Sequence, residues 1–277
     1  KKPQLLIATA NGATQRVLTP FRVRQLTRDI DEGEKIDREA LIRQLTALGY
    51  HRTESVAEHG DFAVRGSLID LYPSGEPLAL RLDFFGDEIE SLRRFDPADQ
   101  RSTGTAAGFL LMPASEALLD EDNVKRFRAG YREAFGATAT GDPLYQAVSD
   151  GRRLAGMEHW LPLFEERLAS LFDYLGEDDI LVRDGGVDAA LEARMESIED
   201  YFQNRTRALQ SEPGSYRPLL PGALYLTSDE WGEALAAGPI HRTSSFREAE
   251  GAATVDFEVD PARDFAPERA RNANVYE

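Results

Sequence analysis

The chain has 277 residues, of which 49 are acidic and 32 are basic, so its formal net charge at pH 7 is −17. This acidic balance disfavours nonspecific binding to nucleic acids, which depends on Lys and Arg releasing counterions from phosphates, so we expect weak or no DNA binding. The absence of cysteine excludes a disulfide framework and a thiolate zinc site, and we expect a cytoplasmic protein.

The length suggests two domains, each large enough to bury a core. The longest apolar stretches, such as residues 109–112, fall far short of the roughly 20 residues that span a bilayer, so we expect no membrane segment. The first residues, Lys1-Lys2-Pro3, include no initiating Met and no signal peptide. We therefore expect a piece of a longer protein.

The N-terminal part predicts a short buried strand over residues 5–10 and a short helix over residues 13–18. A polar, acidic stretch at residues 29–35 follows, and we place the first domain boundary there. A helix is predicted next, because Asp37 is a good N-cap, Leu41, Leu45 and Leu48 recur at helical spacing, and Gly49 is a C-terminal stop.

From Phe62 the hydrophobic period changes to two and continues through residues 68–72, 78–85 and 89–95, with Pro, Ser and Gly residues between them. We interpret this pattern as three consecutive strands with turn-sized gaps. With the preceding helix, this β-meander makes a small α+β domain over residues 31–115.

Past Pro113 the pattern becomes helical at residues 123–135, 142–149, 161–172 and 187–209, with strand-like segments at 180–182 and 224–226. Strands separated by helices favour an α/β layer. If the first strand joins the later ones in one sheet, the fold is an α/β domain with the small α+β domain inserted into it. Residues 261–277 are predicted to be partly unfolded.

Motifs for catalysis are missing from the sequence. The chain has no G-x-x-x-x-G-K-[ST] loop, no G-x-S-x-G elbow and no H-E-x-x-H pair, and its four histidines are widely separated. We therefore expect no catalytic residues and no cofactor. Asp83, Asp87, Glu88 and Glu90 offer oxygen ligands for a divalent metal, but alternating charges at a solubilising sheet edge explain them more simply.

The segment at residues 78–85 has two contrasting faces. Alternation puts Leu78, Leu80, Leu82 and Phe84 on an apolar face, and puts Arg81 and Phe85 together on the other. Arg65 joins that second face if the strand register permits. An aromatic residue beside arginines is typical of protein-interface hot spots. The alternative is that Phe85 packs under a loop or against a helix, with Arg81 paired to Asp83 or Glu88.

Two runs of residues resemble a known family. The run GDFAVRGSLIDLYP at residues 60–73 and the run LRLDFFGDEIESL at residues 80–92 resemble the domain shared by UvrB and the transcription-repair coupling factors (Mfd). The segments at residues 99–102, 144–151 and 156–164 resemble the coupling factors more than UvrB. In place of an acidic nucleotide motif, Arg183-Asp184-Gly185-Gly186 follows the strand-like segment at residues 180–182.

The resemblance implies an incomplete, degenerate helicase-like (P-loop-type) α/β domain with an inserted α+β domain. Residues 1–30 end its first half, residues 31–115 form the inserted UvrA-binding domain, and residues 116–277 form the second half with a C-terminal linker. The residues implied for UvrA contact are Arg65, Arg81 and Phe85.

The implied function is UvrA recruitment by a non-catalytic module that links stalled RNA polymerase to nucleotide excision repair. In the family, the polymerase and DNA are engaged through further domains, including an ATP-driven translocase, that this sequence does not contain. Two alternatives stay open: a fragment of a UvrB-like ATP-dependent repair enzyme, and a scaffold that packs against other parts of its own protein.

Overall fold

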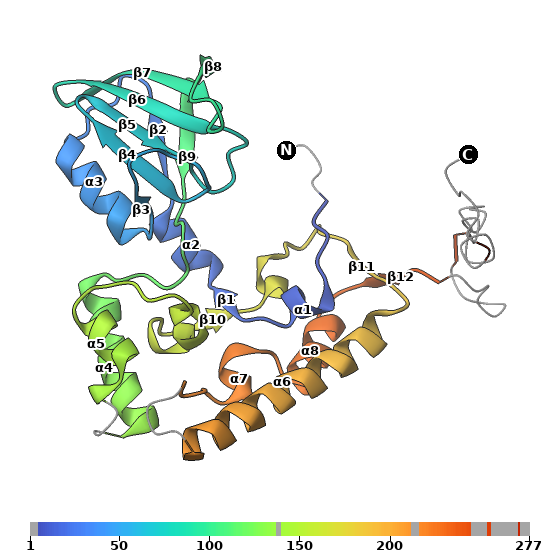
Figure 1. The fold of residues 1–277 in the computed structure, drawn as a ribbon. Coiled ribbons are helices and arrows are strands. Elements are labelled where there is room, and N and C mark those ends of the chain that lie inside the picture. The colour runs from blue at the N-terminus through green and yellow to red at the C-terminus, as the bar shows by residue number, and fades with distance from the viewer. Residues whose placement is uncertain (1–4, 137–139, 212–215, 245–253, 256–270, 272–277) are drawn as a thin grey trace.

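A six-stranded sheet dominates one part of the computed structural model (Figure 1), which describes residues 5–136, 140–211, 216–244, 254–255 and 271. Its strands lie in chain order, β3–β4 is parallel, and the other neighbours are antiparallel. The strands are β3 (His51–Arg52), β4 (Asp61–Arg65), β5 (Leu68–Leu71), β6 (Ala79–Phe85), β7 (Glu88–Phe95) and β8 (Ser102–Thr105). The antiparallel meander is therefore confirmed, but the segment predicted to form three strands forms four, β4 to β7. Gly66, at φ 59°, turns the chain between β4 and β5.

One face of this sheet is covered by helix α3 (Arg38–Ala47) and by the antiparallel pair β2 (Arg28–Asp31) and β9 (Gly108–Leu111). The helix is where its leucine spacing predicts it, and the side chain of Asp37 caps it by accepting a hydrogen bond from the Ala40 amide. Gly49, at φ 88°, follows its end. The shared core buries large apolar side chains from all these elements, among them Ile30, Leu41, Leu45, Phe62, Ile69, Leu80, Leu82, Leu92 and Leu111.

A second core lies below the sheet in Figure 1, reached through helix α2 (Pro20–Leu26). Helices α4 (Glu121–Phe135) and α5 (Pro143–Ser149) confirm the predictions at 123–135 and 142–149. With the 3₁₀ helix η2 (Met157–Leu163), they enclose an aromatic cluster that includes Phe127, Tyr131, Tyr145, Trp160 and Phe164.

The predicted helix over residues 161–172 is wrong. The chain there forms the end of η2, the short strand β10 (Leu168–Ala169) and a second 3₁₀ turn, η3 (Leu171–Tyr174). Leu168 and Ala169 instead pair with Leu18 and Val17, a contact distant in sequence that the helical spacing does not reveal. Ser170 starts a new turn through a capping box with Asp173.

The C-terminal part contains strand β11 (Leu181–Arg183), the long helix α6 (Val187–Ser211), helices α7 (Pro221–Leu224) and α8 (Ser228–Ala236), and strand β12 (Ile240–Arg242). Helix α6 and strand β11 confirm the predictions for those segments. The strand predicted at residues 224–226 is wrong, because Pro221 begins α7 there and Tyr225 forms only an isolated bridge with Gln15.

The single sheet expected for the α/β part is not found among the described residues. Residues 5–9 form no strand, helix α1 (Ala10–Ala13) follows them, and Leu5, Leu6 and Ile7 are 75–85% exposed. Strand β1 (Val17–Leu18) pairs with β10, and β11 pairs in parallel with β12. A strand requires a hydrogen-bonded neighbour, and alternation alone does not say which segment supplies it.

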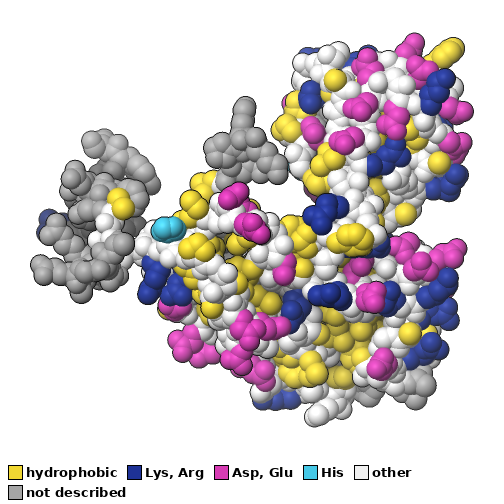
Figure 2. All heavy atoms as spheres, turned by 180° about the vertical axis from the view of Figure 1, so that it is seen from behind, with side chains coloured by type: hydrophobic (Ala, Val, Ile, Leu, Met, Phe, Trp, Pro, Cys, Tyr) yellow, Lys and Arg dark blue, Asp and Glu magenta, His cyan; other side chains and the backbone are white. Residues whose placement is uncertain are grey.

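The tail predicted to be partly unfolded, residues 261–277, lies outside the described residues except for Arg271. Within the part of the chain that is described, no helix is both long enough and apolar enough to cross a membrane. From behind, basic and acidic side chains are interspersed over the surface, and hydrophobic ones gather over its lower part (Figure 2).

Arg16 and Glu230 tie the beginning of the chain to helix α8. An Arg16 Nη atom lies 2.6 Å from a Glu230 carboxylate oxygen, and the other carboxylate oxygen accepts hydrogen bonds from the Thr227 amide and hydroxyl. The hydrogen bond from Arg16, with that from the Thr227 amide, lowers the pKa of Glu230.

Because the folded-state pKa of Glu230 is depressed, its contribution to stability is present above the unfolded pKa and is lost as the pH falls through the folded value. We expect Glu230→Gln to lower the free energy of unfolding at pH 7 by less than about 1 kcal/mol, since the side chain is 39% exposed. The difference from wild type should shrink as the pH falls through the folded-state pKa of Glu230. Urea unfolding followed by tryptophan fluorescence at pH 7 and at a series of acidic pH values checks this, and a difference that is constant with pH contradicts it.

Candidate protein-binding face

The sheet has a second face, opposite the face that packs on α3. The strand register brings Ala63, Asp70, Arg81 and Arg93 into one row across β4, β5, β6 and β7. The next row contains Arg65, Leu68, Asp83 and Ser91. Arg65 and Arg81 therefore lie on the same face of the sheet.

An ion pair between Arg81 and Asp70 crosses the middle of this face. Arg81 donates through Nε and Nη2 to the two carboxylate oxygens of Asp70, at 2.7 and 2.9 Å. The Asp70 side chain is only 2% exposed and the Arg81 side chain 17%. This forked geometry is the strongest form of an arginine–carboxylate contact, and the hydrogen bond to Asp70 raises the pKa of Arg81.

One end of the face is closed by a small apolar cluster. The Arg81 guanidinium carbon lies 4.8 Å from the centroid of the Phe95 ring. Phe95 is fully buried with Val56, Ala63 and Ala79. The side-chain amide of Gln100 donates to the carbonyl oxygen of Val56, which holds the loop that covers this cluster.

The other end of the face is open to solvent, and we call it the open face: Arg65, Leu68, Asp83, Phe85 and Arg93. The side chain of Phe85 is 78% exposed, whereas its neighbour Phe84 is 5% exposed. Strand alternation produces this contrast, and Gly86, at φ 63°, then turns the chain into β7. The alternative in which Phe85 packs under a loop or helix is therefore wrong.

Arg65 is exposed at the edge of the open face, and its Nη2 donates to the carbonyl oxygen of Glu54 at 2.7 Å. It lies two strands and one row from Arg81. With strands about 5 Å apart and alternate residues about 7 Å apart along a strand, Arg65 is not beside Arg81. Arg65 and Arg81 therefore occupy separate positions on the face and do not form one arginine cluster.

Asp83 takes part in the same polar surface. It accepts hydrogen bonds from the Ser67 hydroxyl at 3.0 Å and from an Nη of Arg93 at 3.3 Å. The carboxylate is thus engaged by a hydroxyl and a cation. In the described part of the chain, no group of three or more His, Asp and Glu side chains is placed to hold a metal ion.

The sequence placed Arg81 and Phe85 on one face, and the register adds Arg65. The sequence did not identify Asp70 as the partner of Arg81, and the partners expected from it were Asp83 or Glu88. Asp70 carries a usable signal, since a carboxylate inside the apolar run Leu68-Ile69-Asp70-Leu71 requires a partner if it is buried. Arg93 and Phe95 give no comparable signal without the register.

The comparisons with known proteins cover this same region. Residues 29–116 match the family model described as the UvrB interaction domain. Over 242 residues, 86% of this chain and 20% of the relative, the chain is 38% identical to a transcription-repair-coupling factor of Haemophilus influenzae. It is 37% identical over 228 residues, 82% of this chain, to that of Escherichia coli, and 27% identical over 196 residues to that of Bacillus subtilis.

The chain is a homologue of transcription-repair-coupling factors and contains a UvrB interaction domain. It spans about a fifth of the length of the curated relatives it matches. The open face and the Arg81–Asp70 pair both lie within the residues matched by the UvrB interaction domain.

Because Arg81 is paired with a buried carboxylate and Phe85 is exposed, we expect substitutions of these two residues to differ in their effect on stability. Arg81→Ala leaves the buried carboxylate of Asp70 unpaired, so we expect it to lower the free energy of unfolding by about 3 kcal/mol. Phe85→Ala removes an exposed ring and should change stability by less than about 0.5 kcal/mol. Urea denaturation of both variants measures the two values.

The double variant Asp70→Leu/Arg81→Met replaces both charged groups with apolar side chains and is the control, because it should recover most of the stability lost in Arg81→Ala. An Arg81→Ala variant as stable as wild type would contradict a structural role for the pair.

Proposed function

We propose that this chain recruits UvrA through the open face of its UvrB interaction domain. The observation that carries the proposal is the 78% exposure of Phe85, on a face where apolar and cationic side chains stand together. Large aromatic and arginine side chains account for most of the energy at protein interfaces when a partner desolvates them. The match of residues 29–116 to the UvrB interaction domain supports the same assignment.

In this mechanism Phe85 inserts into an apolar pocket of UvrA as the anchor. Arg65, whose hydrogen bond to the Glu54 carbonyl oxygen uses one of its five N–H donors, makes charge-assisted hydrogen bonds to carboxylate or carbonyl groups of the partner. Arg81 has two N–H groups committed to Asp70 and reaches the partner with the remaining ones. It also fixes the sheet surface on which the other two residues stand.

We further propose that residues 31–115 form a domain inserted between residues 1–30 and 116–277 of a degenerate, helicase-like α/β domain. The first core is drawn from residues 30–111, and the second from residue 18 and residues 117–164, which supports this division. On this proposal the chain is non-catalytic. It serves a parent protein that couples a stalled RNA polymerase to excision repair and supplies ATP-driven movement on DNA through other domains.

Calorimetric titration of the chain with purified UvrA tests the recruitment role. We expect Phe85→Ala and Arg65→Ala each to weaken binding by about 2 kcal/mol, roughly thirtyfold. Both side chains are exposed, so the loss should occur without unfolding, which circular dichroism verifies.

Matched controls come from exposed residues elsewhere on the chain. Phe21→Ala removes an exposed ring from α2, and Arg101→Ala removes an arginine whose side chain is 86% exposed. Neither should change the affinity. Wild-type chain that is folded and binds no UvrA would reject the proposal, and equal losses in all four variants would reject the open face as the site.

A further inference from the structure

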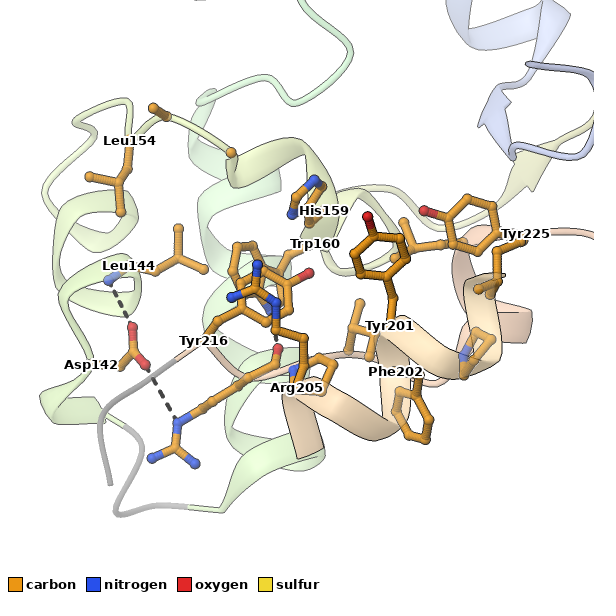
Figure 3. Close-up of a pocket in the computed structure, with 18 of the residues that line it drawn as sticks. Asp142, Leu144, Leu154, His159, Trp160, Tyr201, Phe202, Arg205, Tyr216 and Tyr225 are labelled. Atoms are coloured by element: carbon orange, nitrogen blue, oxygen red, sulfur yellow. Dashed lines mark hydrogen bonds and ion pairs between the residues drawn. The ribbon is translucent and has the colours of Figure 1, made fainter. Parts of the chain in front are cut away.

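A cavity of about 630 Å³ lies outside the UvrB interaction domain, between helix α6 and the segment that runs from α5 to η2 (Figure 3). Residues 216–225 form a third wall. Its size is within the range of sites that hold small organic ligands. Neither the open face nor the UvrA proposal involves any residue of this cavity.

Aromatic rings form much of the lining. Trp160 is 6% exposed, and its indole nitrogen donates to the carbonyl oxygen of Arg217 at 2.9 Å, which fixes the ring. The ring of Tyr216 lies 4.6 Å from it, and His159 meets Tyr216 edge-on at 5.6 Å. Tyr201 extends from α6 beside this cluster and is 68% exposed (Figure 3). Its ring offers a surface on which a planar ring can stack.

The charge of the cavity is opposite to that of the whole chain. Its lining includes three arginines and a single carboxylate, whereas the chain has a net charge of −17. The one carboxylate, Asp142, already lies 3.5 Å from Arg217. An anionic ligand would therefore find a positive potential here.

The two other guanidinium groups have no carboxylate partner within 4 Å among the described residues. Arg205 lies over Tyr216 and Arg194 over Tyr225, each with its guanidinium carbon 5.1 Å from the ring centroid. Neither side chain makes a hydrogen bond within the described part of the chain, so the N–H donors that these two arginines present to the cavity are available to an anionic ligand.

We propose that this cavity binds a nucleoside phosphate. The base stacks on Tyr201 beside Trp160 and Tyr216, and the phosphate accepts hydrogen bonds from Arg194 and Arg205. Stacking on aromatic side chains with arginine contacts to phosphate is the common chemistry of nucleotide recognition without base-specific contacts.

Intrinsic fluorescence provides the test, because the chain has two tryptophans and only Trp160 lines the cavity. In a Trp231→Phe background, AMP should quench Trp160 saturably. Adenosine, which lacks the phosphate, should bind at least about tenfold more weakly. A short single-stranded oligothymidylate is titrated in parallel. Tighter binding of AMP indicates a free nucleotide as the ligand, and tighter binding of the oligothymidylate indicates a nucleotide within a DNA strand.

Variants on helix α6 tie the signal to the cavity. Arg205→Ala and Tyr201→Ala change exposed residues and should each weaken binding about tenfold or more. Arg207→Ala, on the same helix but outside the lining, should not. Phe85→Ala should also leave this binding intact, which separates the result from the UvrA proposal. No saturable quenching by AMP or oligothymidylate up to about 1 mM, or binding that Arg205→Ala and Tyr201→Ala leave unchanged, would overturn the proposal.

Discussion

The Arg81–Asp70 ion pair is the interaction on which the exposed surface of the sheet depends. Both side chains lie at the centre of one face of the sheet, and the other face packs on the apolar core. A carboxylate with 2% exposure is tolerable only because Arg81 meets it with two hydrogen bonds. The pair therefore separates the closed, Phe95 end of the face from the open end that carries Phe85.

The three residues that the family resemblance implies for UvrA contact, Arg65, Arg81 and Phe85, therefore differ in how accessible they are. Phe85 and Arg65 are exposed and able to meet a partner directly, whereas most of Arg81 is committed to the sheet itself. On the UvrA proposal, a loss of binding in an Arg81 variant would therefore combine a lost contact with a disturbed surface. Arg93 pairs with Asp83 on the open face, and Glu88 lies opposite Phe85 on β7, so this surface has mixed charge, which favours orientation of a partner over bulk attraction.

The sequence alone predicted the elements in which local signals agree. Asp37 and the leucine spacing predicted α3, and strict alternation in β6 separated Leu82 and Phe84 from Arg81 and Phe85. It failed where tertiary context decides. Residues 5–9 were predicted to form a strand but form none, and the apolar spacing over residues 161–172 did not reveal that Leu168 and Ala169 pair with β1. Asp70 was missed as the partner of Arg81 because the geometry of the connecting loop sets the strand register. The alternation of side chains does not reveal that geometry.

Photo-crosslinking from position 85 tests most directly that UvrA docks on the open face. The phenylalanine analogue p-benzoylphenylalanine would replace Phe85 in one sample and Phe21, another exposed phenylalanine, on α2, in a second sample. Irradiation with UvrA should yield a covalent complex from position 85 and none from position 21. Crosslinking from position 21 alone, or from neither position while the two proteins still bind, would contradict the account.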